Sequence, residues 1–248
     1  MSIVRSIEVG TAGRNPVRVA LDLVLPRPCP GCGGPQPWCP GCASTVAGRP
    51  RLVRWPEDTR DGAGGLLLPP VRALARYAGP VRAAIIAGKE RGRTDLPVAL
   101  GEAVGRGLLR LRRISVIPAV VWIVPAPSRR SAARRRGGDP VTTMARSAAA
   151  LMASLGVACG VAPCLYTAGG ARDSVGLDAT ARAANLAGRV RFRPAGAPPR
   201  GAAVVLLDDV LTTGSTLLAA TRALSVAGIG VSTAFTVATV APWYSGRR

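Results

Sequence analysis

The segment VVLLDDVLTTGSTL, residues 204–217, joins an apolar run to an acidic and polar one. Four aliphatic residues typical of a buried strand run directly into two adjacent carboxylates, Asp208 and Asp209. A polar turn follows, then a helical pattern over 215–227 that Gly228 closes, and then an apolar run over 231–240. Strand, helix and strand within about 35 residues predict a right-handed βαβ crossover and therefore a parallel sheet.

The polar turn and the two carboxylates favour different parts of one ligand. The turn consists of Thr212, Thr213, Gly214, Ser215 and Thr216. Its glycine, its hydroxyls and the start of the following helix suit a phosphate, whereas Asp208 and Asp209 would repel one. A phosphorylated sugar satisfies both, because its hydroxyls can donate to the carboxylates. Ligands of open α/β sheets bind at the carboxyl ends of strands, where both features are placed. The alternative is a capping turn in which the two carboxylates merely begin a loop.

Further elements extend the α/β pattern on the N-terminal side of this unit. The pattern predicts strands over 71–77 and 119–124 and helices over 16–25, 80–88, 97–112 and 177–187. Gly88 is expected to close the helix over 80–88. Asp139 is predicted to cap another helix, with Pro140 as its first residue and its end near Gly156. The expected fold is α/β, with a parallel sheet flanked by helices.

Composition separates several classes of function. The 248 residues are 48% hydrophobic with a mean hydropathy of +0.25, so the chain can bury a core. Lys and Arg number 33 against 13 Asp and Glu, a net charge of +20 that favours phosphates on nucleic acid, lipid or small substrates. A coding bias toward Arg, Ala and Gly explains the same charge, and both interpretations stay open. The absence of His excludes catalytic triads that contain His, metal sites with His ligands, and His as a general base.

The sequence predicts a cytoplasmic protein without membrane insertion. The apolar stretch 17–25 is interrupted by Arg18 and Asp22 and ends at Pro26, which is not the pattern of a signal peptide or a membrane span.

Four cysteines form two CPGC motifs, Cys29–Cys32 and Cys39–Cys42. Two such motifs can supply a tetrahedral site of four thiolates, which suits a structural Zn²⁺. The six residues between the motifs are fewer than in common zinc ribbons. The alternatives are disulfides, which a reducing compartment disfavours, and an iron–sulfur cluster. Cys159 and Cys164 lie among apolar residues and are predicted to be core or near-surface thiols.

These motifs together resemble a known family. The segment 204–217 resembles the PRPP-binding signature of type I phosphoribosyltransferases, and most of the chain resembles the competence protein ComF family. The resemblance rests on ALDLVLPRPCPGCGG with WCPGC, on YAGPVRAAIIAGKERG (77–92), on IVPAPSRRSAARRRG (123–137), and on Leu177, Arg182 and Asn185. The chain departs from the family at residues 136–140, which read Arg-Gly-Gly-Asp-Pro, and at Ser174. Both departures lie where a second substrate would sit.

The resemblance implies a division into three parts and a role for each site residue. Residues 1–28 would be a helical segment, 29–65 a zinc module of four cysteines with a linker, and 66–248 a phosphoribosyltransferase-like domain. Asp208 and Asp209 would hold the ribose hydroxyls with Mg²⁺, and residues 212–216 the 5-phosphate. Candidates for contacts to pyrophosphate or for a lid are Lys89, Pro125, Ala126, Arg129, Arg130 and Arg136. The alternatives are a solvated loop for the arginines and a surface position for Lys89.

Two functions of different class follow. The first is a PRPP-dependent phosphoribosyltransferase, or a relative that activates the 5-phosphoribosyl group and releases pyrophosphate. The second is a factor in DNA uptake or processing that binds single-stranded DNA or DNA-processing proteins, with PRPP binding regulatory or vestigial. The turn at 212–216 favours the first, and the +20 charge favours the second without specifying it.

Overall fold

The computed structural model describes residues 27–54, 69–127, 138–168 and 189–243. A six-stranded sheet has the order β1-β2-β8-β7-β3-β4, in which β1 is antiparallel and the other neighbours are parallel. Its strands are β1 (Arg51–Leu52), β2 (Val71–Arg76), β3 (Val121–Pro125), β4 (Cys159–Val161), β7 (Val204–Leu211) and β8 (Val231–Thr239). The strands β5 (Leu165–Thr167) and β6 (Val190–Phe192) form a separate antiparallel pair.

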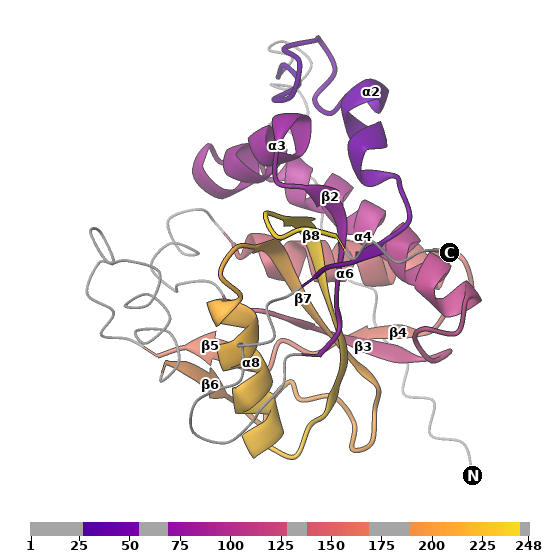
Figure 1. The fold of residues 1–248 in the computed structure, drawn as a ribbon, viewed down its shortest axis with the longest axis vertical. Coiled ribbons are helices and arrows are strands. Elements are labelled where there is room, and N and C mark those ends of the chain that lie inside the picture. The colour runs from indigo at the N-terminus through magenta and orange to yellow at the C-terminus, as the bar shows by residue number, and fades with distance from the viewer. Residues whose placement is uncertain (1–26, 55–68, 128–137, 169–188, 244–248) are drawn as a thin grey trace, which may run out of the picture.

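Helices cover both faces of the sheet (Figure 1). They are α2 (Pro40–Ala43), the 3₁₀ helix η1 (Ser44–Val46), α3 (Gly79–Glu90), α4 (Asp95–Arg113), α6 (Pro140–Ser154) and α8 (Ser215–Val226). Side chains of β7 alternate between two cores, as the period of a strand requires. Val205 and Leu207 pack in the core that holds residues of α3, α4 and α6, and Leu206 packs in the core with α8, β5 and β6.

The βαβ unit predicted at residues 204–240 is confirmed. β7 and β8 are adjacent and parallel, and α8 connects them. Gly228 follows α8 with a φ of +73°, the left-handed conformation of a residue that ends a helix. The predicted cap at Asp139 is also confirmed, because its side chain accepts hydrogen bonds from the Val141 N–H at 3.2 Å and from the Thr142 hydroxyl at 2.7 Å.

The prediction that Gly88 closes its helix is wrong. α3 continues to Glu90, with Gly88 inside it. A Cβ at Gly88 would lie 3.2 Å from Pro97 Cδ of α4, so the glycine permits the close approach of the two helices. The predicted helices over 16–25 and 177–187 lie outside the described residues.

α4 and α6 cross at glycines. A Cβ at Gly101 would lie 2.4 Å from the Met144 carbonyl oxygen, and one at Gly105 would lie 2.9 Å from that of Ala148. The Ser147 hydroxyl donates to the Val98 carbonyl at 2.8 Å across the same contact. The two backbones therefore touch, and this pair forms one layer over the sheet.

The predicted linker after the four cysteines adds an edge strand to the sheet. β1 pairs with β2, and Val53 forms a bridge with Trp243 beyond β8. No membrane-crossing helix, by length and apolar character, occurs in the portions of the chain that the structure describes.

Candidate functional site

Asp208 and Asp209 lie within β7, three and two residues before its end at Leu211. Both are buried, with 9% and 3% of their surfaces exposed. The backbone N–H of Asp209 donates to Asp208 Oδ1 at 2.8 Å. As neighbours in a strand, the two side chains leave the sheet on opposite faces. The prediction that both carboxylates lie near the carboxyl end of this strand therefore agrees with the structure, although the strand continues past them.

Lys89 reaches the acid pair from α3. Its Nζ lies 2.5 Å from Asp209 Oδ2. Burial lowers the pKa of Lys89, but the negative charges of Asp209 and Asp208 outweigh it and raise this pKa above its usual value. Lys89 is also the only lysine among the 33 basic residues of the chain. That count was a signal in the sequence that this position differs from the arginine-rich surface.

Asp208 holds its proton up to mildly basic pH. Burial, and then the charge of Asp209, raise its pKa to about 8. The buried site therefore favours the neutral form of this group. A ligand that brings a cation or donates hydroxyl groups would favour the ionised form and would release this proton on binding.

Replacing Asp208 with Asn should change how stability depends on pH. The folded-state pKa of Asp208 lies above the ordinary value of 3.8. Its contribution to the free energy of unfolding is therefore complete below about pH 4 and is lost as pH rises through 8. Asn does not ionise, so the Tm of Asp208→Asn should increase relative to the Tm of wild type as pH rises. The gain is at most about 1.4 kcal/mol per pH unit between pH 4 and 8, or roughly 3 °C per unit. Thermal melts from pH 5 to 9 measure it, and parallel curves for the two proteins would contradict it.

Thr236 is a further polar residue of the site that was not predicted from the sequence. It lies on β8 directly opposite Asp208 in the parallel register, and it is fully buried. Its Oγ1 has no hydrogen-bond partner among the described residues. The period of a strand could place Thr236 on one face of β8, but only the pairing of β7 with β8 places it beside an acid.

The turn at residues 212–216 connects β7 to α8. Gly214 has φ +74° and ψ −2°, a left-handed conformation that favours glycine. The Thr213 and Ser215 hydroxyls lie 2.8 Å apart, and Thr212 and Thr213 are exposed. No side chain among the described residues caps α8. The N-terminal N–H groups of this helix, Ser215 and Thr216 included, remain available beside two hydroxyls.

β3 brings Pro125 and Ala126 next to the acid pair. Pro125 is opposite Leu207 in the register, and the Ala126 N–H donates to the Leu207 carbonyl at 2.7 Å. Both residues are buried. The other pyrophosphate or lid candidates, Arg129, Arg130 and Arg136, lie outside the described residues.

The four cysteines of the CPGC motifs come together. Their Sγ atoms all lie within 4.8 Å of one another, and Cys32 Sγ is 3.6 Å from Cys39 Sγ. A tetrahedral site with Zn–S bonds of about 2.3 Å has sulfur–sulfur distances of about 3.8 Å. A disulfide would need about 2.05 Å, and each of the six cysteines is a free thiol. The donor set therefore fits a tetrahedral metal such as Zn²⁺.

Local backbone geometry prepares this cluster for a cation. The Gly33 N–H donates to the Cys29 carbonyl at 2.8 Å with Gly33 at φ +76°, and the Cys42 N–H donates to Cys39 Sγ at 3.4 Å. Burial opposes ionisation of Cys29, but backbone N–H groups that point at its sulfur lower its pKa to about 6. Burial and the neighbouring thiols raise the pKa of Cys42, so one thiolate is favoured while no cation is bound. Thiolates are the form that binds metal.

The other two cysteines show the predicted burial. Cys159 is half-buried and Cys164 is buried. Burial raises the pKa of Cys159 to about 12 and raises that of Cys164 as well. Both are therefore unreactive thiols near neutral pH.

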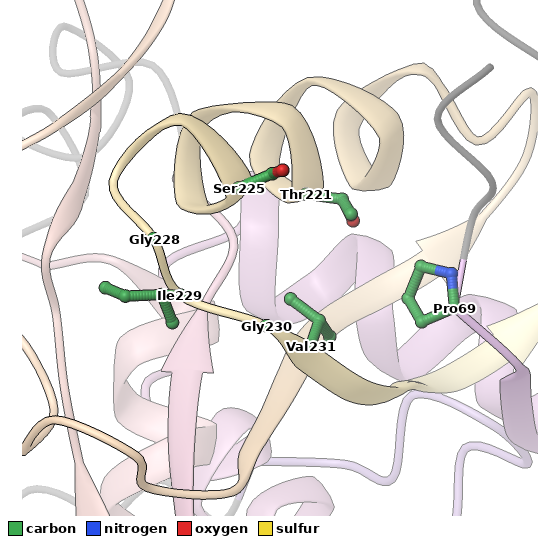
Figure 2. A pocket seen from close by; sticks show the side chains of 7 residues that line it. All are labelled: Pro69, Thr221, Ser225, Gly228, Ile229, Gly230 and Val231. Carbon is green, nitrogen blue, oxygen red and sulfur yellow. The ribbon is translucent and has the colours of Figure 1, made fainter. Parts of the chain in front are cut away.

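A cavity of about 280 Å³ lies at the other end of the sheet (Figure 2). It is lined by residues before β2, in α8, in the loop after α8 and at the start of β8, namely Pro69, Thr221, Ser225, Gly228, Ile229, Gly230 and Val231. A much smaller space, of about 10 Å³, adjoins Lys89 and Asp209. Ligands of parallel sheets bind at the carboxyl ends of strands, so the acid pair, and not the larger cavity, is the candidate site.

Comparisons with known proteins add no family to this description. No family model matches the chain, and no curated protein matches it either.

Proposed function

We propose that the chain is a PRPP-binding protein with a type I phosphoribosyltransferase-like fold, similar to the ComF family. It would transfer or activate a 5-phosphoribosyl group and release pyrophosphate. One observation carries the proposal. The buried acid pair and the uncapped start of α8, with Gly214 in the left-handed conformation, stand on one strand–turn–helix connection. A sugar phosphate needs these two environments a few ångströms apart.

Each residue of the site has a defined task in this proposal. Asp208 and Asp209 accept hydrogen bonds from the ribose hydroxyls, and the N–H groups and hydroxyls of the turn hold the 5-phosphate. The backbone at Pro125 and Ala126 faces the pyrophosphate. Lys89, already paired with Asp209, supplies positive charge beside the leaving group. Bound Mg²⁺ would supply further neutralisation of the pyrophosphate. Catalysis of this kind rests on positioning and charge, which agrees with a chain that has no His.

Titration calorimetry with PRPP and Mg²⁺ tests the proposal. We expect binding at one site, with a heat that differs between buffers of different ionisation enthalpy because Asp208 releases its proton. Ribose 5-phosphate should compete, and pyrophosphate alone should compete less well. In Gly214→Val the β-branched side chain is strained at φ +74°, so affinity should fall. No binding of PRPP to the folded wild-type protein would refute the proposal. If PRPP binds, a screen for pyrophosphate release with bases and amines would identify the acceptor.

The function in DNA uptake or processing stays a prediction of the sequence. Its main support is the net charge of +20, and the arginine run at 134–136 lies outside the described residues. If that run contacts DNA, affinity should fall steeply with salt in wild type and less steeply when the three arginines become Ala.

A further inference from the structure

The cysteine segment, residues 28–46, packs directly on α3, the helix that carries Lys89 (Figure 1). Trp38, the residue before Cys39, packs against Ala84 and Ala87 of α3 and Leu96 of α4. At the other end of α3, a Cβ on Gly31 would lie 2.8 Å from Pro80 Cβ. The cysteine segment therefore contacts α3 near its first turn and again along the turns that lead to Lys89.

Arg93 joins the same segment to the loop between α3 and α4. Its guanidinium donates two hydrogen bonds to Asp95, from Nε at 2.9 Å and from Nη2 at 2.7 Å. It also donates to the carbonyl of Pro28 at 3.0 Å and to that of Pro37 at 2.9 Å. Pro28 precedes Cys29 and Pro37 lies two residues before Cys39, so one side chain holds the start of both CPGC motifs.

The backbone of Arg93 is tied to the end of α3. Its N–H donates to the Ala87 carbonyl at 3.3 Å, and Gly92 makes the turn at φ +65°. Arg93 is 9% exposed, and Lys89 lies four residues before it. A movement of the cysteine segment would therefore reach Lys89 through the turn that ends α3.

We propose that Arg93 is a positioning residue for Lys89. It locks the metal-loaded cysteine segment onto α3 and so holds Lys89 where it pairs with Asp209. Occupancy of the four-cysteine site then sets the affinity of the acid pair for its ligand. The part that concerns PRPP rests on the proposed function, whereas the part that concerns the position of Lys89 does not.

The physical reason is that the cysteine segment has little structure of its own. It holds one short α-helix, a 3₁₀ turn and the four thiolates, and small domains of this kind fold when the metal binds. Without metal, the backbone that holds Trp38 against α3 is no longer fixed. The Arg93 guanidinium then also loses its hydrogen bonds to the carbonyls of Pro28 and Pro37. A helix of 12 residues depends on its packing contacts, since short isolated helices are marginal in water. Val81 and Ile85 hold α3 in the main core, and the cysteine segment supplies the other set of contacts.

Lys89 provides its own reporter, because it is the only lysine in the chain. An amine-acetylating reagent followed by peptide mass spectrometry measures the reactivity of its ε-amine. In the zinc-loaded protein the ion pair with Asp209 should keep acetylation slow. Removal of the metal should speed it by roughly tenfold, a typical size for coupling between two sites.

Arg93→Gln should raise the acetylation rate of Lys89 in the same way while zinc remains bound. Arg106→Gln is the matched control. Like Arg93→Gln, this variant removes one positive charge. Arg106, however, lies on α4 with a side chain that is 47% exposed, and it pairs at 3.6 Å with Glu102. In this control, Lys89 should be acetylated at the wild-type rate. Protection of β7 and β8 in amide hydrogen exchange should persist in every form, which separates local release of α3 from unfolding.

The affinity for PRPP with Mg²⁺ gives the second measurement. Metal removal should weaken binding by roughly tenfold in wild type. In Lys89→Met, removal of the metal should cause little further loss of affinity, because the residue that transmits the effect is gone. Equal affinities with and without metal would overturn the link to the ligand site.

Acetylation of Lys89 that does not change when the metal is removed would overturn the positioning role. If acetylation rises but no form binds PRPP, the proposed function fails and the role of Arg93 stands. If Arg93→Gln does not fold, the metal-free and metal-loaded wild-type proteins decide the question by themselves.

Discussion

The double variant Asp208→Asn, Asp209→Asn should bind PRPP with Mg²⁺ at least a hundredfold more weakly than wild type. Each carboxylate is expected to accept a charge-assisted hydrogen bond from a ribose hydroxyl, worth roughly 1.5–3 kcal/mol. The loss of two such bonds amounts to about 3–6 kcal/mol, and every 1.4 kcal/mol is tenfold in affinity. Asn keeps the volume of Asp, so the effect does not depend on a new cavity.

Calorimetry on the single and double variants measures this loss, with circular dichroism to establish that each is folded. The single variants separate the roles of the two acids. Asp209→Asn also removes the partner of Lys89, whereas Asp208→Asn removes a carboxyl that must first give up its proton. Glu102→Gln is the matched control, since it neutralises an exposed carboxylate on α4. Equal affinity of the double variant and wild type would show that the two carboxylates do not hold the ligand.

The purified protein should contain about one equivalent of metal, and loss of cysteine ligands should remove it. Structural zinc in small Cys-rich sites contributes about 10–16 kcal/mol of binding, so the wild type should retain metal through purification. Cys29→Ser with Cys32→Ser breaks one pair of ligands and should leave little or no metal. Elemental analysis decides the identity as well as the amount. Iron with visible absorbance would point to the iron–sulfur alternative.

Cys159→Ser is the matched control for this experiment. Its side chain is half-buried and it does not belong to the cluster of four sulfur atoms. We expect it to keep its metal at the wild-type level. A wild-type protein that is folded but free of metal would end the assignment of the cluster as a metal centre.

Features that depend only on residues close together in the chain could be predicted from the sequence. The order of β7, turn, α8 and β8 follows from residues 204–240, because a hydrophobic period, a turn and a glycine at the helix end are local properties. The cap at Asp139 followed by Pro140 is equally local. The CPGC motifs predicted four sulfur atoms in one place, because two residues between cysteines leave both side chains on one side of a turn.

Short or interrupted elements could not be predicted in the same way. β5 and β6 have three residues each, too few to show a period, and they are strands because they pair with each other. Gly88 has the identity of a helix-ending residue but lies inside α3, because Pro97 approaches it from another helix. In each case a tertiary contact outweighs the local preference.

The sequence by itself identified the candidate site residues, namely two adjacent carboxylates before a polar turn and two pairs of cysteines. Only the tertiary structure decided their partners. It brings Lys89 to Asp209, places Thr236 beside Asp208, and closes Arg93 on the carbonyls of Pro28 and Pro37. The physical reason is that these partners are separated by more than 20 residues in the chain. Their contacts depend on strand register and helix packing, which are set by burial of the whole core and leave no local pattern.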